Sequence, residues 1–242
     1  SAIALTSLTI DLSYTGLIGS AQSDFLEIGA VTAVIGQRRG TVGTFTGSKR
    51  LNIDFGTTTA AQVNVYGTAT KAQDQNRQPL RLRAVNASTD INVYGGTLAV
   101  SDDSSNSSTI GDILIESGSI NIGDNVTHTT LTQSGGTVNT QSSITTVTLK
   151  GGTLNQYDST SANTITTLTV SNSGSLNHYA SGTITTLNLN GGSVDLTKTQ
   201  KSKTVTTITA SPGASLITDT GTVTITNDIA LASSKKITIG FS

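Results

Sequence analysis

The stretch Ile144-Thr-Thr-Val-Thr-Leu-Lys-Gly-Gly-Thr-Leu154 decides the fold of this chain. Its residues Val147 to Leu149 alternate apolar and polar side chains, which is the period of a β-strand with one buried face. Threonine and valine suit such a strand because their branched side chains favour an extended backbone. The glycine pair that follows can take the positive φ of a sharp corner. The stretch therefore predicts a strand, a corner and a second short strand.

The same phrase recurs along the chain. It returns as Ile165-Thr-Thr-Leu-Thr-Val, as Ile184-Thr-Thr-Leu-Asn-Leu-Asn-Gly-Gly and as Val205-Thr-Thr-Ile-Thr-Ala, at steps of 21, 19 and 21 residues. Upstream, Val63-Asn-Val-Tyr-Gly and Ile91-Asn-Val-Tyr-Gly are near-copies separated by a polar insertion at Gln73–Arg83. The glycines that end the strands are about 19.5 residues apart on average: Gly96, Gly118, Gly136, Gly152, Gly174, Gly192 and Gly213.

A period near 20 residues, built of β-branched alternation and glycine corners, predicts an all-β, single-stranded parallel β-helix of either hand. Leucine-rich repeats share the period but need a dense leucine scaffold. Residues 50–242 would supply about ten coils, each about 4.8 Å above the last. Residues 1–49 break the period, and we expect them to form an N-terminal arm or a cap on the first coil.

The composition excludes several classes of protein. The 242 residues carry a net charge of −1, only 12% of them are charged, and none is Cys, Met or Trp, whereas 45 are Thr and 30 are Ser. Without cysteine there is no disulfide framework and no thiolate chemistry. A charge near zero disfavours broad electrostatic binding of nucleic acid or anionic membrane. No apolar run reaches the length of a membrane span.

The search for catalytic groups finds little. His128 and His178 lie in polar strands or turns, and we expect both on the solvated surface. Glycan-cleaving β-helices need carboxylates that converge on one face, yet Asp102-Asp103 is the sole acidic pair after residue 100, inside a polar loop. The sequence therefore predicts a protein that is not an enzyme and has no catalytic residue, metal site or cofactor.

Basic residues are more frequent in the first part of the chain. Residues 1–100 hold eight positive and six negative charges, and residues 101–242 hold six and nine. The bias is either ordinary surface charge or a surface that faces an acidic partner. Apolar side chains beside glycine-bounded arginines are the mixture found at interface hot spots. We therefore expect partner contacts at Val31, Val34, Ile35, Arg38, Arg39 and Phe45.

Threonines recur at matched positions of the repeat. Thr146 and Thr148, with their counterparts at 167 and 169, 207 and 209, and 224 and 226, would stack into columns if the strands are in register. Flat threonine arrays bind ice in several β-solenoid antifreeze proteins, and thermal hysteresis would test that remote alternative. The simpler interpretation is that threonine is a favourable outward residue of a strand.

Several segments together resemble small proteins of tailed phages encoded near the capsid genes. They are Leu8–Thr15, Gly36–Gly43, Leu51-Asn-Ile-Asp-Phe-Gly, the Asn-Val-Tyr-Gly motifs at Asn64 and Asn92, and the later Gly-Gly-Thr coils. The resemblance is to β-helical head decoration, or cement, proteins. It implies a homotrimer in the virion, on the capsid exterior, that contacts the major capsid protein and stabilises the shell. A phage tail-spike or bacterial adhesin module that binds glycans is the alternative.

Overall fold

The computed structural model describes three long segments, residues 89–100, 107–159 and 162–218. It also describes shorter pieces, at 4–5, 8–10, 26–27, 29–30, 32–35, 44–45, 51–54, 62–66, 70–71, 80–83, 85, 223–227, 229–231 and 238–241. The chain divides into two compact units, Ser1–His128 and Thr129–Ser242, which are taken in turn.

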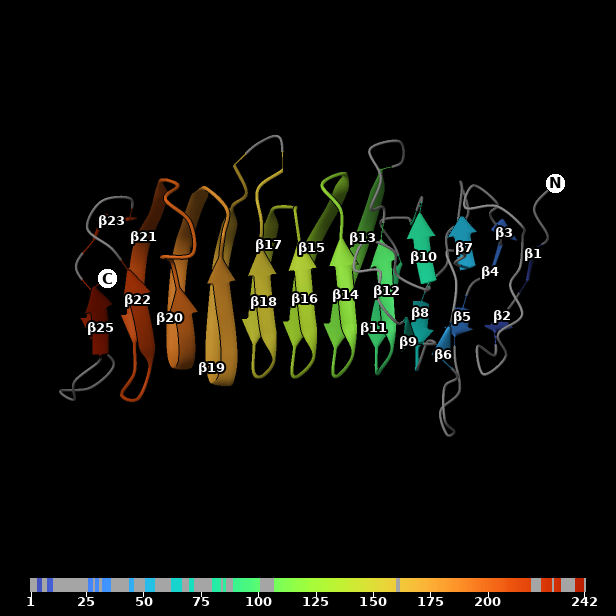
Figure 1. Ribbon diagram of the computed structural model, residues 1–242, viewed down its shortest axis with the longest axis horizontal. Helices are drawn as coiled ribbons and strands as arrows, with labels where there is room; N and C mark the ends of the chain where they lie inside the picture. Colours follow the sequence, from blue (N-terminus) through green and yellow to red (C-terminus); the bar gives the residue numbers. More distant parts are fainter. Residues whose placement is uncertain are drawn as a thin grey trace. The chain divides into compact units, whose positions relative to one another are not determined.

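The N-terminal unit is built of short strands (Figure 1). Their bounds are β1 Ala4–Leu5, β2 Leu8–Ile10, β3 Leu26–Glu27, β4 Gly29–Ala30, β5 Thr32–Ile35, β6 Thr44–Phe45, β7 Leu51–Asp54, β8 Gln62–Val65, β9 Thr70–Lys71, β10 Leu80–Arg83, β11 Asp90–Val93, β12 Thr97–Val100, β13 Ser108–Ile115 and β14 Ser119–Ile122. Strand β15, Val126–Gln133, crosses the boundary between the units.

Two long ladders of parallel strands run through this unit, and β1 with β4 and β6 with β9 form separate parallel pairs. One ladder runs β2, β5, β8, β11 and β13, and the other runs β3, β7, β10, β12 and β14. Successive coils are in register, so Val63 pairs with Ile91 and Ile91 with Ile113. All three side chains are buried. Each coil thus places the same inward position above that of the coil before it.

The C-terminal unit repeats this arrangement with longer strands (Figure 1). Their bounds are β16 Thr137–Thr140, β17 Ile144–Leu149, β18 Thr153–Gln156, β19 Ile165–His178, β20 Gly182–Asp195, β21 Lys203–Ala210, β22 Ser215–Thr218, β23 Val223–Ile225, β24 Ala230–Leu231 and β25 Thr238–Phe241. Strands β19 and β20 each contribute to two faces of their coil, since β19 pairs with both β17 and β18, and β20 with both β21 and β22.

Stacked aliphatic side chains fill this unit. Leu168 pairs with Leu187, Leu187 pairs with Ile208, and all three are fully buried. Burial of a leucine side chain contributes about 2 kcal/mol to folding, and the gain repeats in every coil. The narrow interior explains why the chain needs so few aromatic residues.

The predicted fold class is confirmed, because every described element is a strand and the strands form a parallel β-helix. The described strands make about seven turns, fewer than the ten expected. One reason is that coils near the N-terminus are long, since the equivalent residues Asn64 and Asn92 are 28 positions apart. The insertion predicted at Gln73–Arg83 is also shorter than expected, because its last four residues form β10, with Leu80 and Leu82 buried.

The boundary predicted at residue 49 stays a prediction. Within the first 49 residues, β5 pairs in parallel with β2 on one side and with β8 on the other. The same ladder therefore includes strands on both sides of that boundary.

Glycine corners hold successive coils close together. The second glycine of each Gly-Gly pair has a positive φ, for example 75° at Gly152 and 68° at Gly192. A Cβ atom on Gly192 would lie 2.4 Å from the carbonyl oxygen of Gly174 in the preceding coil. Both the backbone conformation and the contact exclude a side chain there.

We expect Leu187→Asp to lower the free energy of unfolding by about 4 kcal/mol, because it places an unpaired carboxylate among apolar side chains. Leu187→Ala, which only leaves a cavity, should cost about 3 kcal/mol. The exposed Thr185 of the same strand provides the control, and Thr185→Asp should change stability by less than about 0.5 kcal/mol. Urea unfolding measures all three, and a larger loss for Thr185→Asp than for Leu187→Asp would show that β20 faces the other way.

Substitutions at two glycines distinguish the cost of backbone strain from the cost of steric contact. Gly213 has a φ of 83° but no atom within 4 Å of an added Cβ, whereas Gly192 has both a positive φ and the Gly174 contact. Gly213→Ala should therefore cost about 1 kcal/mol, which is the strain alone. Gly192→Ala should cost about 2 kcal/mol more, because the neighbouring backbone must move. Equal losses in urea unfolding would contradict the close approach of the coils.

Candidate functional site

Asparagine side chains form a hydrogen-bonded ladder across the C-terminal unit. The amide of Asn155 donates to Asn139 at 2.9 Å, and the amide of Asn177 donates to Asn155 at 2.8 Å. The three residues pair in register through β16, β18 and β19. In the N-terminal unit, Asn92 donates to Asn64 at 3.0 Å in the same sense. These side-chain hydrogen bonds link each coil to the next.

Threonines form the columns that the repeat predicts. Thr146, Thr167, Thr186 and Thr207 pair in succession, and Thr148 pairs with Thr169. Asn188 occupies the next position of the second column, before Thr209. The expected continuation to Thr224 is wrong, because Thr224 pairs with Thr204, on a different part of β21. Ice binding stays a prediction.

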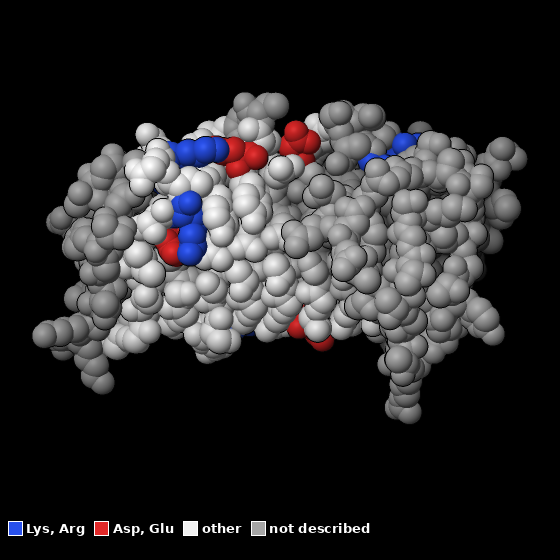
Figure 2. All heavy atoms as spheres, viewed as in Figure 1, with Lys and Arg blue, Asp and Glu red and all other residues white. Residues whose placement is uncertain are grey.

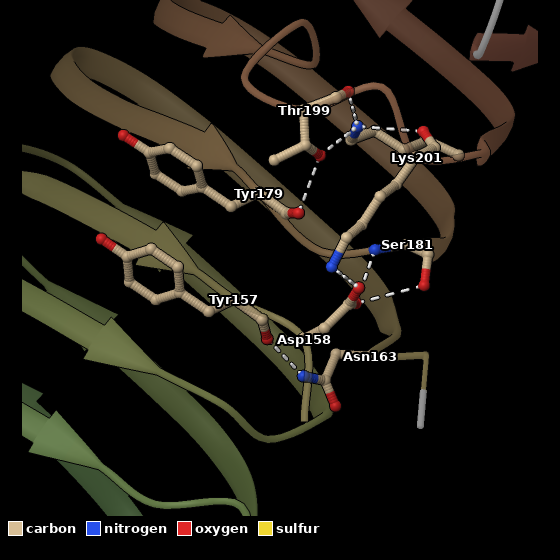
Figure 3. A network of polar contacts seen from close by, with 8 residues as sticks. Tyr157, Asp158, Asn163, Tyr179, Ser181, Thr199 and Lys201 are labelled. Carbon is tan, nitrogen blue, oxygen red and sulfur yellow. Dashed lines mark hydrogen bonds and ion pairs between the residues drawn. The ribbon is translucent and has the colours of Figure 1, made fainter. Parts of the chain in front are cut away.

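Tyr157 and Tyr179 form a stacked pair (Figure 3). The rings of Tyr157 and Tyr179 are 4.7 Å apart between centroids and only 13° from parallel. Tyr157 is the one large hydrophobic side chain that is exposed among the residues with described burial, at 36%. Burial raises the pKa of the Tyr157 phenol, and Tyr179 raises it further. Tyr66 and Tyr94 of the N-terminal unit stack in the same manner, at 4.9 Å.

Asp158 ties together the loops of three coils (Figure 3). Its carboxylate accepts hydrogen bonds from the backbone and side chain of Ser181, at 2.6 and 3.1 Å, and from Lys201. Desolvation would raise the pKa of Asp158, but the bonds from Lys201 and Ser181 outweigh it and hold the pKa below its usual value. Lys201 and Asp158 are 43 residues apart in sequence, so the ion pair closes a large loop.

A second lysine, Lys203, lies inside the unit with 2% of its surface exposed. Its ammonium donates to the carbonyl of Thr199 at 2.9 Å, to the hydroxyl of Thr199 at 3.2 Å and to the carbonyl of Lys201 at 3.1 Å. The Thr199 hydroxyl in turn donates to the carbonyl of Tyr179 at 2.9 Å. This buried cation closes the turn that precedes β21. We call the group Asp158, His178, Tyr179, Ser181, Thr199, Lys201 and Lys203 the polar corner.

Both histidines contradict the sequence-based expectation. His128 is 3% exposed and His178 is fully buried, so neither is a solvated surface residue. Burial lowers the pKa of each to about 4, which keeps both imidazoles neutral at pH 7. Strand period is the signal that was missed: His178 follows the buried Leu176 by two residues, as Gln156 follows the buried Leu154.

The partner-contact residues predicted from sequence are placed only in part. Val34 and Ile35 lie in β5, and Phe45 lies in β6, but their side chains are outside the described residues. Val31, Arg38 and Arg39 are wholly outside them. The contact surface therefore stays a prediction.

The described residues hold few groups with catalytic chemistry. Among them, no three His, Asp or Glu side chains gather as they would around a metal ion. In the same residues there is no helix of the length and hydropathy that a membrane span requires. Figure 2 shows charged side chains in small groups on the visible face, with uncharged surface over most of its described part. Several polar side chains of the C-terminal unit bond to one another across coils.

Comparison with known proteins finds no counterpart: no family model, no curated protein and no solved structure matches the chain.

The polar corner predicts that two carboxylates of equal exposure differ in importance. Asp158 and Asp195 are each 16% exposed, but Asp195 bonds only to residues within its own turn, Thr197 and Lys198. Asp158→Asn should lower the free energy of unfolding by about 2 kcal/mol at pH 7, because it weakens bonds between coils. Asp195→Asn should cost under about 1 kcal/mol.

The pH dependence of the stability lost in Asp158→Asn tests the same role of Asp158. The folded pKa of Asp158 is below the ordinary 3.8, so its contribution is present above that pH and is lost as the pH falls below it. Urea unfolding at pH 7 and pH 3 should therefore show the cost of Asp158→Asn shrinking in acid. A larger effect at Asp195 would contradict the assignment.

Proposed function

We propose that this chain is a non-enzymatic structural protein, a decoration subunit that binds the outer surface of a tailed-phage capsid and stabilises the shell. Its partner is the major capsid protein, its location is the virion exterior, and it acts as a homotrimer. A symmetric trimer multiplies weak contacts through effective concentration, which suits attachment to a symmetric shell.

The observation that carries the proposal is that polar side chains of the chain bond one coil to the next. In the C-terminal unit the asparagine ladder and the Asp158 bonds join coil to coil, each within hydrogen-bonding distance. Such side chains stiffen a scaffold, whereas a catalytic centre needs titratable groups aimed at a substrate. The sequence resemblance to cement proteins supports the same role.

The test is the composition of purified particles of the phage that encodes the chain. We expect the protein in stoichiometric amount on the outside of the shell, as trimers visible by electron cryomicroscopy. Particles stripped of it should lose their genome at a lower temperature. Absence of the chain from the particles, or its presence only at the tail, would contradict the proposal.

The charge reversal Arg38→Glu with Arg39→Glu locates the contact. It should weaken binding of the added protein to stripped particles, more strongly at low salt than at high salt, because exposed charges are screened. The matched control is Lys198→Glu, at an exposed charge of the C-terminal unit. Equal effects of the two changes would move the contact away from the N-terminal region.

A second candidate, a glycan-binding module of a tail spike or adhesin, is favoured by one observation. Tyr157 is exposed and stacked on Tyr179, and aromatic rings beside hydroxyl and carboxylate groups suit sugar binding. A glycan array separates the candidates. Binding that Tyr157→Ala abolishes would support the glycan module, and its absence with recovery of the chain on capsids would support decoration.

A further inference from the structure

His178 occupies an inward column that is polar for three successive coils and apolar in the fourth. Thr140 pairs with Gln156, and Gln156 pairs with His178. Asn177 pairs with Asp195, so the following residue, Leu196, occupies the same position one coil further on. All four side chains of this column, at positions 140, 156, 178 and 196, are buried. The imidazole is therefore enclosed by its own column on both sides.

Neither ring nitrogen of His178 has a hydrogen-bond partner. The neighbouring Gln156 uses its amide nitrogen on the carbonyl of Ser142, at 3.2 Å. A fully buried imidazole with two unsatisfied nitrogens is costly even when neutral, and a charged imidazolium without an acceptor is far more costly. The closed site therefore favours the neutral ring.

The charged groups around the ring reinforce that preference. Lys203, at the start of β21, is a buried ammonium that repels a second positive charge, and Asp158, which follows β18, opposes it. Asp158 is already engaged by Lys201 and Ser181. The residue that follows β20, the apolar Leu196, is the member of the column in the next coil. Desolvation is the largest cause of the lowered pKa of His178, and Lys203 is the second.

We propose that His178 is an acid-sensitive latch, and that protonation of its imidazole opens the polar corner of the C-terminal unit to water. An imidazolium gains solvation only if the turn after β19 separates from the turn before β21, whose carbonyls Lys203 binds. We expect strands whose inward side chains are aliphatic, such as β17 and β19, to keep their register when the corner opens. The device is independent of what the protein binds.

The first test follows local opening in the intact protein by amide hydrogen exchange. The amides of Tyr179 and Ala180 donate to the carbonyl of Gln156 at 2.8 and 3.0 Å, so they report on the corner. Opening restores an ordinary pKa of 6.5 to a ring that has about 4 when closed, so acid favours the open form. Protection factors of both amides should fall about 30-fold between pH 7.5 and pH 5.

The amide of Ser175, which donates to the carbonyl of Gly152 at 3.0 Å, is the internal reference and should change little. Asp158 does not interfere, because its pKa lies below 3.8. Equal loss of protection at 175 and 179 would indicate global unfolding and overturn the latch.

The matched variants are taken from the column itself. His178→Gln copies the residue of the preceding coil, and His178→Leu copies Leu196 of the next. Both should abolish the pH dependence at Tyr179 and Ala180. His128→Leu removes the other buried histidine and should leave it unchanged. A 30-fold loss that persists in His178→Gln would overturn the proposal.

A second measurement follows the imidazole itself and needs neither of the His178 variants. The chain has two histidines, so their imidazole signals in a nitrogen-resolved NMR spectrum are assigned with the His128→Leu protein. We expect the His178 ring to stay neutral in the closed protein and to titrate together with the loss of protection at 179 and 180. A ring that titrates near pH 6.5 while those amides stay protected would overturn the latch.

Discussion

The structure depends on hydrogen bonds between equivalent strands of successive coils. Because these strands are parallel and in register apart from a shift between Asn172 and Ser175, most paired residues lie next to their counterpart one coil away, and similar side chains often stack. The consequence reaches each layer of the protein: aliphatic side chains form the core, asparagines form a ladder, and tyrosines stack ring on ring. The environment of a side chain is therefore set by the residues above and below it in its column more than by its neighbours in sequence.

This dependence explains which features could be predicted. Apolar residues two apart, as at Val147 and Leu149, identify the inward face, and the Gly-Gly pairs identify the corners. Division of the chain by its mean repeat overestimates the number of turns, since loops add residues without adding strands. The short strand Leu80–Arg83 was hidden because its arginines suggest a polar insertion, although Leu80 and Leu82 are buried.

The polar corner could not be predicted in the same way. Asp158 and Lys201 are 43 residues apart, and nothing in their local sequence pairs them. Their contact follows from the lengths of the loops between strands, which vary from coil to coil. The burial of His178 could have been predicted from the alternation of buried residues along β19, which points its side chain inward. The sequence-based interpretation instead placed it on the surface because histidine is polar. Where coils stack in register, the position of a residue in the strand alternation predicts its burial better than its residue type does.

The asparagine ladder also has a direction. Asn177 donates to Asn155 and Asn155 donates to Asn139, so the amide dipoles align and each bond polarises the next. Such a row extends toward the C-terminus only while the next coil supplies a donor. The register places Asp195 there, and an ionised carboxylate can only accept. Asp195 instead accepts from the backbone of Thr197 and from Lys198, so the direction of the row determines where it ends.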